Sequence, residues 1–170
     1  IIENEKLETT AAEAFKNIIL YPEQGKKYYA FLEQHGFGKA AGYRIFTLKF
    51  CRDGKNITED LERSNHIKLW NILAKSDYYP SVMFVNDGKL VVIRQDIEKN
   101  LIKNLADMLD AIAEQNHFSY VMGISAELRG YLSAAKLLSE AEAARKTAAV
   151  AQKNFEFYDD IGIDKVIFGV

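Results

Sequence analysis

The chain has 170 residues, 48% of them hydrophobic and 12% aromatic, so it can bury the core of one ordinary domain and carry a short appendage. Its 22 basic and 24 acidic residues leave a formal net charge of -2, which gives no overall basic surface for nucleic acid. A single cysteine, Cys51, excludes an internal disulfide framework, and no apolar run approaches the roughly 20 residues that cross a bilayer. We therefore expect a cytoplasmic protein with no membrane partner.

Residues 3–20 predict a helix with a narrow apolar seam. The seam residues, spaced four, three and four apart, are Leu7, Ala11, Ala14 and Ile18. One alternative is that the seam covers the chain's own domain. The other is that it is a dimer interface or connects to an upstream domain, so residues 1–25 are assigned to a linker or dimerisation helix.

The next segments alternate between helix and strand. Residues 26–35 predict a helix that ends at Gly36, whose missing side chain suits a left-handed cap. Residues 43–51 alternate polar and apolar side chains and predict a strand. Residues 58–75 predict a helix with Thr58 and two acidic residues in its first turn.

The clearest local signal is a β-hairpin between Ser81 and Arg94. Two short apolar runs flank the sequence Asn86-Asp87-Gly88-Lys89. Asp-Gly at the centre of such a turn supplies the positive φ angles that a tight hairpin requires.

The remaining elements complete a repeated pattern. Residues 97–115 predict an amphipathic helix, 118–124 a strand, 128–152 a second helix capped by Ser125, and 155–158 a last strand. Asp159 or Asp160 is expected to cap a final helix. The basic and acidic residues that interleave along 128–152 predict a solvated outer face.

The order of elements predicts the fold class. Strand, helix, hairpin, helix and strand give the β-α-β-β-α-β pattern of a ferredoxin-like α+β fold, with one more strand at its end. We expect an antiparallel sheet with its helices packed on one face, plus the N-terminal helical segment.

Three runs in the carboxyl-terminal half resemble one bacterial family. They are Tyr120-Val-Met-Gly-Ile-Ser125, Leu138-Ser-Glu-Ala-Glu-Ala-Ala-Arg145 and Phe157-Tyr-Asp-Asp-Ile-Gly-Ile163. Together they resemble the GGDEF-like domain of PucR/CdaR-type transcriptional regulators, over roughly residues 26–170. The resemblance implies an upstream sensory region and a downstream helix-turn-helix, so we expect this chain to be a fragment of a longer one.

Diguanylate cyclases share this kind of fold, and their hairpin carries a Gly-Gly-acidic-acidic-Phe loop. With acidic residues of the first strand, that loop holds Mg²⁺ against the triphosphate. Here the turn reads Asn86-Asp87-Gly88-Lys89, and the first strand has no carboxylate before Asp53. The sequence thus predicts no catalytic residue, no metal site and no cofactor.

Other reactive residues give no catalytic pattern. Asp53 and Asp87 are typical turn residues, although they could meet in space and bind a cation. The three histidines, His35, His66 and His117, lack the close spacing of metal ligands. Cys51 lies in an apolar strand without a nearby histidine, which favours an inert thiol.

These observations predict a non-catalytic regulatory or interaction domain of a bacterial transcriptional regulator, with a homo-oligomer as the expected assembly. Contact with DNA is expected from the downstream domain rather than from this fragment, and the small-molecule effector is unspecified. The alternative is a degenerate cyclase-like domain that binds a nucleotide or another small ligand as a sensor.

Overall fold

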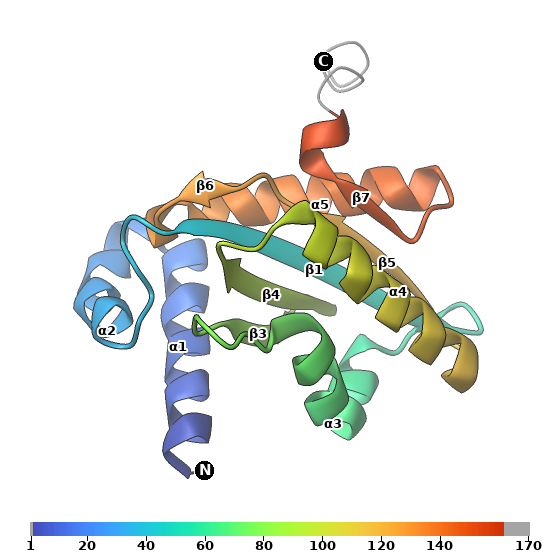
Figure 1. Ribbon diagram of the computed structural model, residues 1–170, viewed down its shortest axis with the longest axis horizontal. Coiled ribbons are helices and arrows are strands. Elements are labelled where there is room, and N and C mark those ends of the chain that lie inside the picture. The colour runs from blue at the N-terminus through green and yellow to red at the C-terminus, as the bar shows by residue number, and fades with distance from the viewer. Residues whose placement is uncertain (1, 162–170) are drawn as a thin grey trace.

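The computed structural model describes residues 2–161, with side chains from residue 11 onward, and over this range the chain has an α+β fold (Figure 1). The α-helices are α1 (Ile2–Leu20), α2 (Tyr29–Gln34), α3 (Thr58–Leu69), α4 (Lys99–Asn116) and α5 (Ala134–Val150). The strands are β1 (Gly42–Arg52), β2 (Lys55–Asn56), β3 (Val82–Asn86), β4 (Lys89–Gln95), β5 (Ser119–Ile124), β6 (Leu128–Arg129) and β7 (Phe155–Phe157). Short helical turns are η1 (Pro22–Tyr28), η2 (Trp70–Ala74), η3 (Tyr131–Ser133) and η4 (Tyr158–Ile161).

The strands form one mixed sheet in the order β3-β4-β1-β5-β7. The central strand β1 pairs antiparallel with β4 and β5, while β2 and β6 pair with its two ends. The expectation of a purely antiparallel sheet is wrong at one edge, because β7 runs parallel to β5. Helix α5 joins these two strands, and a helical crossover returns the chain in its original direction.

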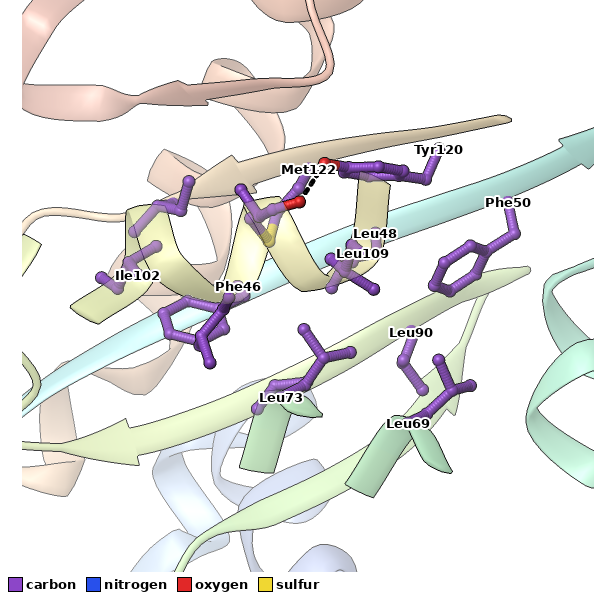
Figure 2. Packing of buried hydrophobic residues seen from close by; sticks show 14 of the residues in the cluster. Phe46, Leu48, Phe50, Leu69, Leu73, Leu90, Ile102, Leu109, Tyr120 and Met122 are labelled. Atoms are coloured by element: carbon purple, nitrogen blue, oxygen red, sulfur yellow. Dashed lines mark hydrogen bonds between the residues drawn. The ribbon is translucent and has the colours of Figure 1, made fainter. Parts of the chain in front are cut away.

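Helices cover both faces of the sheet, so the expectation of a single covered face is also wrong. Phe46, Leu48 and Phe50 of β1 point into a first core with α3 and α4, part of which is shown in Figure 2. Tyr43 and Ile45 point into a second core with α1, α2 and α5. Because both faces are covered, β1 is buried along nearly its whole length.

The N-terminal helix packs on the second face of this sheet. Three of the four predicted seam residues, Ala11, Ala14 and Ile18, are buried there together with Phe15. The chain's own strands and helices therefore cover these three, as the first alternative for the seam proposed. Leu7 belongs to the part of α1 whose side chains are not described.

Several predicted helices begin or end differently in the structure. Residues 26–35 divide between η1 and α2, although Gly36 has the left-handed φ of 89° that its capping role predicts. Helix α3 bends at Asn65, where φ is -129° and ψ is 29°, and continues as the π-helical turn η2. The bend and the π-helical turn allow η2 to pack into the first core, to which its residues Leu73 and Ala74 belong.

The helix predicted from residue 128 begins only at Ala134, because Leu128 and Arg129 pair with β1 as β6. Ser125 does not cap it. The Ser125 hydroxyl instead accepts a hydrogen bond from the Ile45 N–H at 2.8 Å and donates to the Ala126 carbonyl at 2.9 Å.

Asp159 and Asp160 lie in the turn η4, and the final helix expected after them lies outside the described residues. No helix within residues 2–161 combines the length and the apolar character needed to cross a bilayer.

Candidate functional site

The β3–β4 turn lies where a cyclase of this fold would carry its catalytic loop. Asp87 and Gly88 both have positive φ angles, 52° and 71°, which define the tight hairpin turn that the sequence predicts. The amide of Asn56 donates to the Gly88 carbonyl at 2.8 Å. Asn56 Oδ1 also accepts a hydrogen bond from the backbone N–H of Thr58 at 2.9 Å. The hairpin turn is therefore tied to β2, the short strand that follows β1.

Asp53 lies in the turn between β1 and β2 with a φ of 52°, so both predicted aspartates occupy left-handed turn positions, which aspartate tolerates. The bond between Asn56 and Gly88 places β2 beside the β3–β4 turn, but no cluster of three or more potential metal ligands forms among the described residues. The interpretation of Asp53 and Asp87 as turn residues agrees with their backbone conformation.

An ion-pair network lies next to the turn, on the face covered by α5. Glu142 accepts hydrogen bonds from Thr47 Oγ1 at 2.7 Å and from Arg145 Nη2 at 2.8 Å. Lys89 Nζ lies 3.4 Å from a Glu142 oxygen and 3.5 Å from an Asp87 oxygen. The network connects α5 to β1 and β4.

The charge state of Glu142 follows from these contacts. Burial alone would raise the pKa of its carboxyl group, but the hydrogen bonds from Arg145 and Thr47 and the positive charges of Arg145 and Lys89 outweigh burial. The net effect lowers the pKa, so Glu142 is ionised at neutral pH. The predicted solvated face of this helix is wrong here, because Arg145 and Glu140 are buried.

Helix α5 can approach the sheet this closely because residue 123 is glycine. A Cβ atom at Gly123 would overlap the Ala141 carbonyl oxygen and the Arg145 backbone nitrogen. The small residues Ala141, Ala144 and Ala148 complete the contact and are fully buried.

A small hollow opens between α3 and α4 on the other face. It encloses about 50 Å³ and is lined by Arg52, Leu61, Asn65, Lys68, Leu69, Ile112, Asn116 and Phe118. A shallower groove of about 210 Å³ adjoins it along Arg52 and the first turns of α3. Ligand pockets usually measure about 300 Å³ or more, so the hollow holds a few water molecules rather than a nucleotide.

Arg52 is the charged residue common to the hollow and the groove. Its guanidinium donates to the carbonyl oxygens of Asn116 at 2.9 Å and His117 at 3.3 Å, at the end of α4. His117 adopts a left-handed conformation there and ends the helix. Cationic side chains at a helix C-terminus interact favourably with the unpaired carbonyls, so Arg52 already has a structural role.

A second charged site lies where the described chain ends. The guanidinium of Arg44, in a residue only 8% exposed, donates to the carbonyls of Ile97 at 3.1 Å and Ser125 at 3.2 Å. Its Nη1 also lies 3.9 Å from Oδ2 of Asp159. Lys99 Nζ lies 3.4 Å from the same Asp159 oxygen and 3.6 Å from Oδ1 of Asp160.

We call Arg44, Lys99, Asp159 and Asp160 the terminal clasp. It connects the central strand and the first residue of α4 to the turn η4. The two aspartates were predicted as helix caps, and the structure also shows them as ion-pair partners of residues far away in sequence. No local sequence signal indicates these partners.

Arg94 lies directly across from Arg44 in the β1–β4 pairing. It is 5% exposed and donates to the Leu73 carbonyl at 2.9 Å, while its Nε has no hydrogen-bond partner among the described residues. Burial lowers the pKa of its guanidinium. Arg94 therefore fixes the end of η2 against the sheet, and sequence analysis did not single it out.

The histidines and the cysteine remain apart from these sites. His35 packs edge-on against Phe31, and His66 hydrogen-bonds Glu62 at 2.6 Å. Cys51 is a half-buried free thiol near the end of β1. The structure does not bring any of the described histidines together with Cys51 as a site.

The fold and its two charged sites define an α+β domain whose last described turn, η4, is held by ion pairs. Comparison with protein-family models and with curated proteins finds no match to the chain.

Proposed function

We propose that the chain is a non-catalytic regulatory domain of a PucR/CdaR-type bacterial transcriptional regulator. In this proposal it is cytoplasmic and homo-oligomeric, and it couples an upstream sensor region to a downstream helix-turn-helix outside the chain. The strand order β5-β1-β4-β3 supports the proposal, because it is the order of a ferredoxin-like sheet, the fold that the resemblance implies. The added strand β7, which follows α5, agrees with the extra terminal strand expected from the sequence.

The terminal clasp is the observation that carries this proposal. The motif beginning at Phe157 provides much of the family resemblance, and Asp159 and Asp160 of that motif pair with Arg44 and Lys99. Arg44 also binds the carbonyls that follow β4 and β5. A shift of the sheet or of α4 would therefore move the turn from which the chain continues to the proposed DNA-binding domain.

The proposal that the chain is not an enzyme rests on the residues around the hairpin turn. A cyclase needs carboxylates there that can neutralise the charge of a triphosphate through Mg²⁺. In this chain the nearby Glu142 is already bound by Lys89, Arg145 and Thr47. A carboxylate held by two cations in a packed interface is a structural group.

The experiment for this function uses the complete gene that contains the chain. Asp159→Lys combined with Asp160→Lys places positive charges against Arg44 and Lys99 and should open the clasp. We expect altered transcription of the regulated genes at an unchanged level of the protein. Lys146→Asp is a control, because Lys146 is an exposed residue of α5 outside the clasp. Unchanged transcription with the clasp opened would contradict the coupling role.

A second candidate function is a small-ligand sensor that uses the hollow between α3 and α4. The bend of α3 at Asn65 favours it, because a distorted helix beside a hollow can open more easily than a regular one. The hollow in this structure is smaller than a nucleotide, so the function requires α3 to open at its bend, and calorimetric titration of the chain with GTP and Mg²⁺ tests for such an opening. Saturable binding that Arg52→Ala abolishes would favour the sensor, and an absence of heat would reject GTP as its ligand.

A further inference from the structure

The strand β3 forms one edge of the sheet. It pairs with β4 on one side, and no strand within residues 2–161 pairs with its other side (Figure 1). Its sequence, Val82-Met-Phe-Val-Asn86, contains no charge and no proline. Proteins usually protect an exposed edge strand with charged residues or proline, because the free backbone groups of the edge attract another strand.

The hairpin turn determines which backbone groups of β3 face outward. Asp87 and Gly88 form the turn between the paired residues Asn86 and Lys89, so these two form a hydrogen-bonded pair. Bonded and non-bonded pairs alternate along an antiparallel ladder. The N–H and C=O groups of Met83 and Val85 therefore point away from β4, toward the open edge.

This open edge lies in a groove of about 370 Å³ between α1 and α3. Met83, Phe84 and Val85 form its floor, with Ala12, Glu13 and Lys16 of α1 on one side and Glu62 and His66 of α3 on the other. Lys16 Nζ lies 5.1 Å from the centre of the Phe84 ring. The floor is apolar and carries the outward backbone groups, so it fits an extended strand.

We propose that a second copy of this chain occupies the groove, with its β3 strand antiparallel to the first. In this arrangement a twofold axis perpendicular to the sheet passes near Phe84 and joins the two sheets edge to edge. Met83 of one copy then exchanges main-chain hydrogen bonds with Val85 of the other. An antiparallel pair of identical strands is self-complementary in this way, and closed twofold symmetry is the commonest form of oligomer.

The charges on α1 also favour a second copy as the occupant. Glu13 and Lys16 lie one turn apart on the side of α1 that borders the groove. The twofold axis keeps each α1 on the same face of the joined sheet and reverses its direction. Glu13 of one helix then faces Lys16 of the other, and the reverse pair forms at the same time.

The proposal also moves the expected dimer surface away from the predicted seam. Ala11, Ala14 and Ile18 of that seam are buried within their own chain, so they have no surface to offer a second copy. The β3 edge, in contrast, has outward backbone groups for which no partner exists among the described residues.

Sedimentation velocity of the 170-residue chain over a wide concentration range tests this interface. Wild type should form a dimer, and Val85→Pro should weaken it by about tenfold or more, because proline removes an outward N–H without affecting the bonds to β4. Val85→Ala keeps the N–H and is the matched control, which should still dimerise. A monomeric wild type, or a Val85→Pro dimer as tight as wild type, would overturn the proposal.

Charge exchange gives an independent readout if Val85→Pro does not fold, as checked by circular dichroism. Glu13→Lys and Lys16→Glu should each weaken the dimer, since each places like charges across the axis. The double variant, which carries both changes, restores opposite charges and should recover the wild-type dimer. Equal association of all four proteins would reject the arrangement about β3.

Discussion

Nη1 of Arg44 lies 3.9 Å from Oδ2 of Asp159, which links the buried central strand to the last described turn of the chain. Arg44 is 8% exposed and also binds two backbone carbonyls, whereas the Asp159 side chain is 40% exposed. The arginine is thus a fixed anchor, and the aspartate is the partner that can leave. Because one partner is fixed and the other can leave, the contact can open and close, as the proposed coupling requires.

We expect the clasp to contribute little to global stability but much to the order of its own turn. Asp159→Asn should lower the free energy of unfolding by less than about 1 kcal/mol, because the ion pair is partly exposed. Amide hydrogen exchange in residues 155–161 should nevertheless become faster in the variant. Arg44→Gln should cost more, about 2–3 kcal/mol, because it also removes bonds to buried carbonyls. Equal losses from the two variants in urea titrations would contradict this division of roles.

Glu142 should make the stability of the domain depend on pH. Its pKa in the folded state is lowered from the usual value of 4.5, so its contribution is complete above that value and is lost as pH falls further. At pH 7, Glu142→Gln should destabilise the fold by about 1–3 kcal/mol, since the charged hydrogen bonds weaken. The difference from wild type should shrink in acid, where the wild-type carboxyl group is also protonated. A difference that stays constant down to acid pH would show that the charge of Glu142 does not matter.

Gly123 should not tolerate a side chain. Gly123→Ala should destabilise the domain by about 3 kcal/mol or more, because its Cβ overlaps the backbone of α5. Thermal unfolding measures the loss. Gly38→Ala is a control, since its nearest contact would be the Ala41 Cβ atom at an ordinary 3.4 Å. Similar melting temperatures for the two variants would mean that α5 does not lie this close to β5.

A charge in the buried face of α1 should unfold the domain rather than separate two chains. Ala11→Asp places a carboxylate in the second core, at a cost of about 3 kcal/mol or more. Circular dichroism should show loss of structure in the variant. A folded Ala11→Asp monomer, obtained from a wild-type dimer, would instead support the predicted seam as a dimer interface.

The sequence is most informative where local chemistry determines structure. Asp87 and Gly88 predict the hairpin because their turn requires positive φ, and the apolar period of residues 97–115 predicts α4. The small strand β6 could not be predicted, because Leu128 and Arg129 are extended only through pairing with Gly42 and Tyr43. Its formation depends on the tertiary fold rather than on its own two residues.

The two charged sites could not be predicted from the sequence either, because their ion pairs also depend on the tertiary fold. Arg44 shares one face of β1 with Phe46 and Leu48, so the alternation places it on the apolar face that α3 and α4 cover, but no local pattern indicates which groups its charge would pair with there. Arg145 and Glu142 lie on a helix with mixed charges, and only the contact at Gly123 places them against the sheet. Ion pairs between distant segments leave no periodic signal in the sequence.

The most direct test of the regulatory proposal measures transcripts in cells that carry the complete gene. Three strains are compared: wild type, a deletion of the gene, and the clasp variant with both Asp159→Lys and Asp160→Lys, whose protein level is checked by immunoblot. We predict that the deletion changes a defined set of transcripts and that the clasp variant changes the same set at a normal protein level. If neither strain alters any transcript, the proposal that this chain is part of a transcriptional regulator is contradicted.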